Sequence, residues 1–136
     1  MSHKVPQIIR SQVARRAQFK CEYCLMPEEL SFLPFQIDHI ISLEHGGGSE
    51  IDNLAYSCPH CNQHKGSDLS TFLEHYQDIE RLFNPRIDQW NGHFEVSSGE
   101  IRSISRIGKA TVKLLRMNEP ERLAIRRILA EVGLYP

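Results

Sequence analysis

Two Cys-x-x-Cys pairs, Cys21–Cys24 and Cys58–Cys61, constrain the fold of this sequence more than any other feature. Each pair can form a tight knuckle whose two sulfurs point at one ion, and two knuckles complete a tetrahedral Zn(Cys)4 site. Two disulfides are the alternative use of four cysteines, but the paired spacing favours zinc. We therefore expect a structural Zn²⁺ ion to staple the segment between these cysteines.

The size and composition fit a small globular protein. The 136 residues suffice for one domain with a modest core, and 40% hydrophobic and 24% charged residues are typical of soluble proteins. No apolar stretch follows Met1, and no run approaches the length needed to cross a membrane. We therefore expect a cytoplasmic protein with no membrane partner. Because the cytoplasm is reducing, we expect the cysteines to be metal ligands rather than disulfides.

The net charge of −1 conceals a strong segregation of charge along the chain. Residues 1–20 and 101–116 each carry five bases and no acid, whereas residues 22–80 carry eleven acids against the single base Lys65. A bound polyanion would therefore be contacted mainly by the two basic segments, 1–20 and 101–116. The candidate phosphate contacts are Arg15, Arg16, Lys109 and Lys113. Solvated helix faces are the alternative interpretation of each basic block.

Local patterns predict mixed helix and strand. Pro6 can begin a helix that runs to about residue 18, and Pro120 can begin a terminal helix. An apolar stripe at helical spacing predicts the buried face of that terminal helix: Ile125, Ile128, Leu129 and Val132. Further expected elements are a strand over 35–41 ending near His39, an extended segment over 51–56, a short helix ended by Gly66, a helix over 67–83, turns and short strands over 87–106, and a helix over 107–117.

A carboxylate and an imidazole stand side by side between the two knuckles, at Asp38 and His39. A carboxylate can bind a divalent ion, and an imidazole with a pKa of about 6.5 can take a proton from water at neutral pH. Adjacent strand residues point to opposite faces, so the two side chains can share a site only if the strand ends or bends there. The pair indicates a hydrolytic metal site.

Several spaced elements together resemble an HNH endonuclease, in the subset with two zinc-binding Cys-x-x-Cys pairs. They are Asp38-His39-Ile40-Ile41, Gly46-Gly47-Gly48, Asn53-Leu54-Ala55 and Cys58-Pro59-His60-Cys61-Asn62-Gln63-His64-Lys65-Gly66. The match covers residues 21–66. Residues 81–94 resemble a C-terminal extension of some bacterial members, to which no activity is attached.

The resemblance implies an α+β fold with a ββα-metal core, stapled by Zn(Cys)4 and flanked by helices. We expect a single HNH nuclease domain over 1–136, with a basic N-terminal helix (1–20), the HNH/zinc core (21–66) and a helical C-terminal extension (67–136). The implied activity is metal-dependent hydrolysis of DNA phosphodiester bonds that leaves a 5′-phosphate.

The resemblance also implies roles for single residues. His39 would be the general base, and Asp38 would bind a divalent ion that stabilises charge on the phosphate and the leaving oxygen. Asn53 would fix the loop and orient His39. Asn62 stands where other members have the final His, and its amide oxygen suits Mg²⁺ or Mn²⁺. His64 is the rival ligand.

Lys65 has two interpretations. As the one base in the acidic segment, beside the expected catalytic ion, it could contact the scissile or an adjacent phosphate. Alternatively it is a surface lysine at a helix C-terminus, where the helix dipole favours a cation.

Two other functions compete with the nuclease. One is a non-catalytic nucleic-acid-binding module on a zinc-knuckle scaffold, and the other is a structural zinc domain for protein contacts, which leaves Asp38 and His39 unexplained. Because no specificity domain is recognisable, either the basic flanks read DNA weakly or a partner protein or a second copy in a homodimer directs the cut. Trp90 and Phe94 are expected in a minor core rather than as base-stacking platforms.

Overall fold

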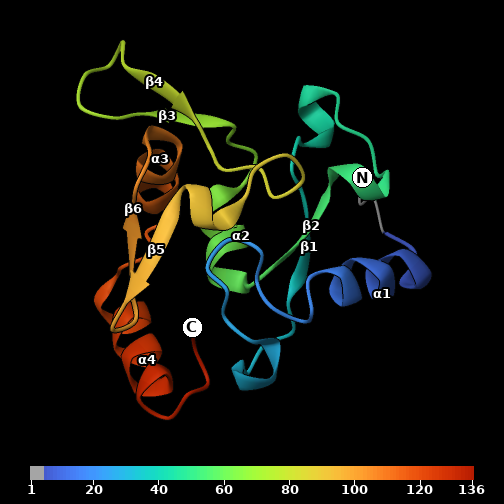
Figure 1. The fold of residues 1–136 in the computed structure, drawn as a ribbon. Coiled ribbons are helices and arrows are strands. Elements are labelled where there is room, and N and C mark those ends of the chain that lie inside the picture. The colour runs from blue at the N-terminus through green and yellow to red at the C-terminus, as the bar shows by residue number, and fades with distance from the viewer. Residues whose placement is uncertain (1–4) are drawn as a thin grey trace.

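A computed structural model describes residues 5–136 of the protein. The chain forms four helices and three separate two-stranded antiparallel sheets over these residues (Figure 1). None of the described helices is both long and apolar enough to span a membrane. The architecture is α+β, as the sequence predicts.

The N-terminal half contains one hairpin between two helices. Helix α1 (Gln7–Arg16) precedes the first cysteine knuckle, strands β1 (Gln36–His39) and β2 (Leu54–Ser57) pair with His39 opposite Leu54, and helix α2 (Pro59–Lys65) follows at once. Short 3₁₀ turns lie at Glu28–Leu30, Leu43–His45 and Ile51–Asn53. The predictions of α1, of a strand that ends at His39 and of a helix that ends before Gly66 are confirmed.

The C-terminal half contains the other two hairpins and two longer helices. These elements are β3 (Ser70–Phe72), β4 (Ile79–Arg81), a 3₁₀ turn at Trp90–Gly92, β5 (Phe94–Ser97), β6 (Glu100–Ser103), α3 (Arg106–Leu114) and α4 (Pro120–Glu131). The predicted strands within 87–106 and both predicted helices are present.

The prediction of a helix over residues 67–83 is wrong, and the C-terminal extension is therefore not wholly helical. Strand alternation instead places Leu73 in a small core with Leu82 and Ala110, while Phe72 stays partly exposed on the other face. Apolar runs this short do not distinguish a strand from a helix, and packing against α3 decides the outcome.

The predicted apolar stripe of α4 faces the core only through Leu129, which is partly buried against the central cluster. Ile125, Ile128 and Val132 are 44%, 62% and 64% exposed, whereas Arg126 between them is fully buried. Arg126 donates to the carbonyl oxygens of Gly99 (2.6 Å) and Met117 (2.6 Å). The buried face of α4 is thus defined by the hydrogen bonds of an arginine, which an apolar pattern does not report.

One buried cluster connects the two halves. It combines α1 and the cysteine knuckles with Phe83, Phe94, Ile101, Leu115 and Met117 of the C-terminal half. Trp90 packs on Phe94 with ring centroids 4.9 Å apart, and its Nε1 donates to the carbonyl oxygen of Tyr23 at 2.9 Å. The expectation that Trp90 and Phe94 are core residues is confirmed.

Candidate active site and zinc centre

The four cysteines converge on one point in the core. All are buried free thiols, and their sulfur atoms lie within 4.8 Å of one another. The Sγ atoms of Cys24 and Cys58 are 3.7 Å apart, close to the ~3.8 Å that four tetrahedral Zn–S bonds of about 2.3 Å require. In each knuckle the amide of the second cysteine points at the sulfur of the first, at 3.5 Å and 3.4 Å. The donor set fits Zn²⁺.

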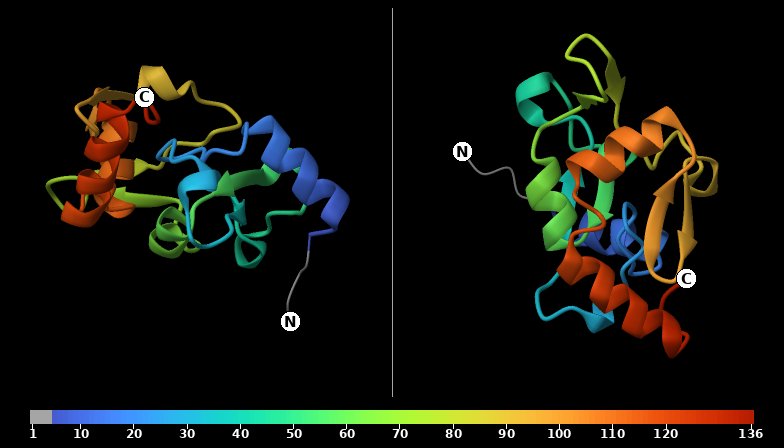
Figure 2. Two further views of the ribbon diagram at one scale, coloured as in Figure 1. Left: turned by 90° about the horizontal axis from the view of Figure 1, so that it is seen from below. Right: turned by 90° about the vertical axis from the view of Figure 1, so that its left-hand side faces the viewer.

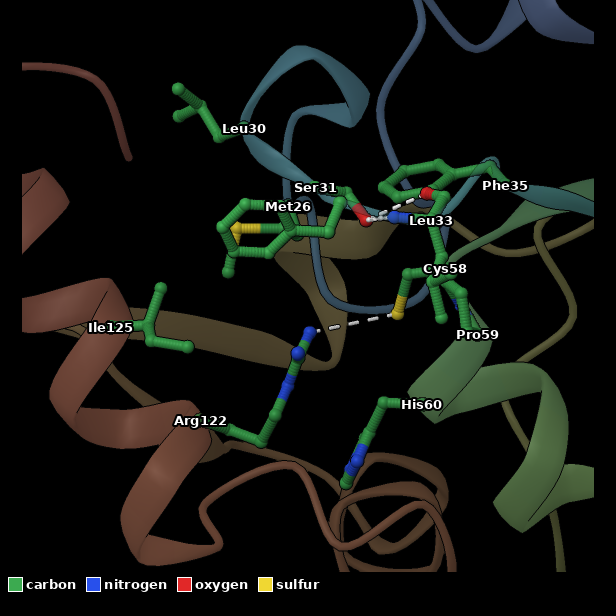
Figure 3. A pocket seen from close by; sticks show the side chains of 11 residues that line it. Met26, Leu30, Ser31, Leu33, Phe35, Cys58, Pro59, His60, Arg122 and Ile125 are labelled. Atoms are coloured by element: carbon green, nitrogen blue, oxygen red, sulfur yellow. Dashed lines mark hydrogen bonds between the residues drawn. The ribbon is translucent and has the colours of Figure 1, made fainter.

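A cation from the C-terminal half lies against this cluster. Arg122 of α4 points its Nη2 at the Sγ of Cys58, 3.7 Å away, beside an apolar hollow of about 260 Å³ (Figure 3). Burial lowers the pKa of Arg122, but the neighbouring Cys24, Cys58 and Cys61 together outweigh burial and raise it. Because a Zn(Cys)4 site carries two negative charges, Arg122 partly neutralises it. The sequence patterns gave no indication of this role.

Asp38 is buried within a charged hydrogen-bond network. Its side chain is 4% exposed, and it accepts a hydrogen bond from the Tyr23 hydroxyl at 2.6 Å and one from Lys65 Nζ at 3.2 Å. Burial raises the pKa of Asp38, and the charge of Lys65 and the hydrogen bond from Tyr23 oppose that rise. Tyr23 lies between the two cysteines of the first knuckle, so this bond links the zinc centre to Asp38.

Lys65 is a buried partner of Asp38, and its interpretation as a surface lysine is wrong. Its side chain is 2% exposed, and Nζ also donates to the carbonyl oxygens of His39 (3.3 Å) and Ile40 (3.1 Å). An ammonium group has three donors, and these three oxygens use them all. The phosphate contact predicted for Lys65 stays a prediction, and it requires the side chain to leave Asp38.

His39 lies at the end of β1, and strand alternation directs it away from the buried side of Asp38. Its Nε2 lies 3.0 Å from the Oγ of Ser49, on the loop that joins β1 to β2. The half-buried imidazole therefore belongs to the loop side of the hairpin, where a polar partner holds it and solvent reaches it.

Asn53 fixes this loop. Its Oδ1 accepts from the amide of Ile41 (2.9 Å), and its Nδ2 donates to the carbonyl oxygens of Ile41 and Gly48 (both 2.8 Å). A Cβ atom at Gly47 would lie 1.8 Å from the Ile41 carbonyl oxygen, so only glycine permits this close approach. The three bonds go to the backbone of the loop that carries Ser49, and the orientation of His39 by Asn53 stays a prediction.

Helix α2 presents Asn62 and His64 in different directions. The Asn62 amide donates to the side chain of Gln36, which is two residues from Asp38 and therefore on the same face of β1. His64 instead packs on His60, with ring centroids 4.4 Å apart. The Nε2 of His60 in turn contacts the Leu115 and Arg116 carbonyl oxygens at 2.9 and 3.0 Å. Asn62, not His64, thus shares the β1–α2 interface with Asp38.

Three of the four residues predicted to contact phosphate already contact other groups of the chain. Arg16 donates to the carbonyl oxygens of Ile51 (3.0 Å) and Leu54 (2.6 Å), so it supports the HNH hairpin, whereas Arg15 is exposed on α1. Lys109 pairs with Glu74 at 3.2 Å, and Lys113 Nζ lies 3.6 Å from the centre of the Phe72 ring. Their binding of phosphate stays a prediction.

The charge segregation of the sequence is only partly resolved by ion pairs in three dimensions. Arg106 of α3 pairs with Asp78 (2.5 Å) and Glu80 (2.9 Å) on the β3–β4 hairpin, and Arg86 pairs with Glu22 beside the first knuckle. Together with Lys109 and Glu74, these contacts bring the basic segment 101–116 onto the acidic segment 74–80. Five of the eleven acids of residues 22–80 thus have an ion-pair partner among the described residues, counting Asp38 with Lys65.

The comparisons with known proteins agree with this geometry. Residues 21–68 match the family model of the HNH endonuclease. The chain contains an HNH endonuclease domain. It is also 27% identical over 114 residues to the Septu protein PtuB of Bacillus thuringiensis, an alignment that covers 81% of this chain and 41% of that protein. The chain thus spans about two-fifths of the length of this curated relative. No solved structure matches.

The match to the HNH endonuclease model indicates a nuclease-type domain over residues 21–68. The clustered cysteines fit a zinc site within this domain. Three residues of the site carry no motif signal in the sequence: Tyr23, Gln36 and Arg122. Their partners lie 15, 26 and 64 residues away along the chain, so local spacing could not identify them.

Proposed function

We propose that this protein is a metal-dependent endonuclease that hydrolyses DNA phosphodiester bonds, with His39 as the general base. The observation that carries the proposal is the placement of His39 within the matched HNH domain. Its imidazole stands at the end of β1, against Ser49, on a loop that Asn53 clasps. An imidazole held this way can take a proton from an attacking water at neutral pH.

The residues of the β1–α2 interface can hold the divalent ion, and His39 can serve the same site only because β1 ends at that residue. Asp38 and Asn62 offer one carboxylate and one amide oxygen, a hard donor set that suits Mg²⁺ or Mn²⁺ completed by water and phosphate. Such an ion supplies Lewis-acid stabilisation of charge on the phosphate and the leaving oxygen. Since Tyr23 and Lys65 already bind Asp38, the ion must share this carboxylate with Lys65 or replace it.

A non-catalytic nucleic-acid-binding module is the second candidate, and the same ion pair favours it. Lys65 supplies the positive charge that Asp38 would otherwise seek from a metal. In that case the HNH domain keeps its fold and still binds nucleic acid, but it does not cleave it.

A plasmid-nicking assay with Mg²⁺ or Mn²⁺ distinguishes the two candidates. We expect the wild type to nick and His39→Ala to lose about 10²- to 10⁴-fold in rate, the usual contribution of a general base. His45→Ala, an exposed histidine of the same loop, should retain activity. Equal rates for His39→Ala and the wild type would reject this mechanism, and binding without cleavage under both metals would support the second candidate.

The same assay tests the metal ligands on α2. Asn62→Ala should raise the Mg²⁺ concentration needed for half-maximal nicking, because it removes the oxygen donor on the Asp38 side. His64→Ala should leave that concentration unchanged, since His64 packs on His60. The reverse result would assign the metal to His64.

We further propose that Arg15, Lys109 and Lys113 contribute phosphate contacts from opposite sides of the HNH hairpin, where Figure 1 places α1 and α3. Each replacement by Gln should reduce the slope of log K against log salt by about 1 and leave zinc content unchanged. Arg16→Gln is a less specific test, because Arg16 also holds β2. Unchanged slopes would show that these residues touch no phosphate.

A further inference from the structure

The β3–β4 hairpin carries an aromatic cluster that its own packing does not explain. Its buried face is formed by Leu73 and Leu82 against Ala110 of α3. On the other face Phe72, Tyr76 and Ile79 are 36%, 80% and 57% exposed, and the Phe72 and Tyr76 rings lie 5.1 Å apart in an edge-to-face arrangement. A short two-stranded hairpin needs its packed face for stability, so the exposed face is available for another use.

Positive charge borders this exposed face. Lys113 Nζ lies 3.6 Å from the centre of the Phe72 ring, while Lys109 and Arg106 pair with the acids of the hairpin, Glu74, Asp78 and Glu80. The three bases Arg106, Lys109 and Lys113 together offset the charge of these three acids. Phosphates can therefore approach this surface without the repulsion that the acidic sequence of the hairpin predicts.

The hairpin also follows the HNH site closely along the chain. Lys65, whose Nζ contacts Asp38 and the carbonyl oxygen of His39, ends α2, and β3 begins five residues later at Ser70. A chain of that length spans at most about 18 Å, and Phe72 lies at most about 25 Å from Lys65. Figure 1 and the right panel of Figure 2 show the hairpin and the loop after β1 rising on the same side of the molecule.

We propose that Tyr76, held edge-to-face by Phe72, forms a stacking platform for unpaired nucleobases of the nucleic-acid strand that the HNH site engages. Exposed aromatic rings beside cations are how proteins hold single strands without reading sequence, because every base has a π-face and every linkage a phosphate. The platform rests on the proposed nucleic-acid function, and it selects an unpaired strand over a duplex.

Binding by a cleavage-deficient protein tests the platform. The full chain with His39→Ala is titrated in Mg²⁺ against a fluorescein-labelled single strand of about 12 nucleotides, within the range of known site sizes, and against the matching duplex. Adding Tyr76→Ala should weaken single-strand binding by about 5- to 30-fold and change duplex binding by less than about twofold, as expected for one lost stacking contact.

Two control variants separate base stacking from a general loss of aromatic surface. Tyr76→Phe keeps the ring and should bind like the parent. Phe32→Ala removes a fully exposed aromatic that follows the Glu28–Leu30 turn, at the opposite end of the molecule from the hairpin, and should also bind like the parent (Figure 1). Equal affinities of Tyr76→Ala and the parent overturn the platform, and so does an equal loss in Tyr76→Ala and Phe32→Ala. A Tyr76→Ala effect on self-association alone, measured by sedimentation, assigns the patch to protein contacts and likewise overturns it.

The nicking assay keeps this inference separate from the proposed function. If the wild type nicks DNA but Tyr76→Ala binds the single strand normally, the platform is wrong and the nuclease stands. If Tyr76→Ala loses single-strand affinity in a protein that never nicks, the platform stands and the proposed hydrolysis is wrong.

Discussion

The HNH half of the molecule and its C-terminal half are held together by different forces. The HNH half is organised around polar centres: four sulfurs at one point, the buried Asp38–Lys65 pair, and the loop clasp of Asn53. The C-terminal half relies more on apolar contacts and exposed ion pairs such as Arg106 with Asp78 and Glu80, although Arg126 is buried and hydrogen-bonded within it. In the HNH half, the buried groups that stabilise the fold are therefore also those proposed for the chemistry. In the C-terminal half, the groups that stabilise the fold have no proposed role in the chemistry.

The C-terminal half is attached to the zinc centre at several points. The Tyr135 hydroxyl donates to the carbonyl oxygen of Cys24 at 2.6 Å, the Trp90 indole donates to that of Tyr23, and Arg122 reaches Cys58. These contacts fix the extension onto the first knuckle and onto the start of α2. Loss of the metal should therefore also loosen the extension.

Of the changes that distinguish the two halves, removing the zinc site should reduce stability the most. Cys61→Ser, or chelation of the wild type, should unfold the HNH half, because structural zinc contributes about 10–16 kcal/mol in small domains whereas whole domains have only about 5–15 kcal/mol of stability. Hydrogen exchange should rise more in β1 and β2 than in β5 and β6. Zinc analysis and thermal melts followed by circular dichroism measure the result.

Gln63→Ala, at an exposed position of α2, is the matched control and should keep both zinc and melting temperature. An unchanged melting temperature and unchanged zinc content in Cys61→Ser would show that no zinc staple holds the fold.

Breaking the buried ion pair should have the next largest effect. Lys65→Met leaves Asp38 charged and unpaired in the core and should cost about 3–5 kcal/mol in the free energy of unfolding, measured by urea denaturation. Adding Asp38→Asn should recover part of that loss, since the uncompensated charge is gone. Lys109→Met, which breaks the exposed pair with Glu74, should cost at most about 1 kcal/mol. Similar losses in both lysine variants would contradict the contrast between the two halves.

Breaking an exposed ion pair should have the smallest effect on stability. It should be detected mainly as a change in the pKa of the acid. The hydrogen bond from Arg106 lowers the pKa of Asp78 below its usual value of about 3.9. Since the folded-state pKa is the lower one, the stabilisation is present above the unfolded value and is lost as pH falls through the folded value. Arg106→Gln should raise the pKa of Asp78 in an NMR titration. An identical titration curve in both proteins would show that the pair does not form in solution.

The zinc site and the HNH motif could be predicted because their information is local. A Cys-x-x-Cys pair forms its own knuckle, and Asp38, His39, Asn53 and Asn62 are recognised by spacing along the chain. The end of β1 at His39 and the end of α2 before Gly66 follow from local patterns for the same reason. Asn53 also holds the loop as predicted, although through Ile41 and Gly48.

Other features depend on contacts between distant segments. Whether 67–83 forms a helix or a hairpin depends on α3, which packs against it from about 40 residues further along the chain. Helix α4 buries Arg126 rather than most of its apolar stripe because distant carbonyl oxygens accept its hydrogen bonds. By local pattern Lys65 is a surface cation, but the fold buries it against Asp38, 27 residues earlier.

The amino-acid sequence alone thus specifies which chemical groups the protein carries and where the metal-binding motifs begin and end. Tertiary packing selects which of those groups are buried together. The physical reason is that a charge or a ring acquires its partner from segments that local spacing does not describe, as Asp38 does from Tyr23 and Lys65.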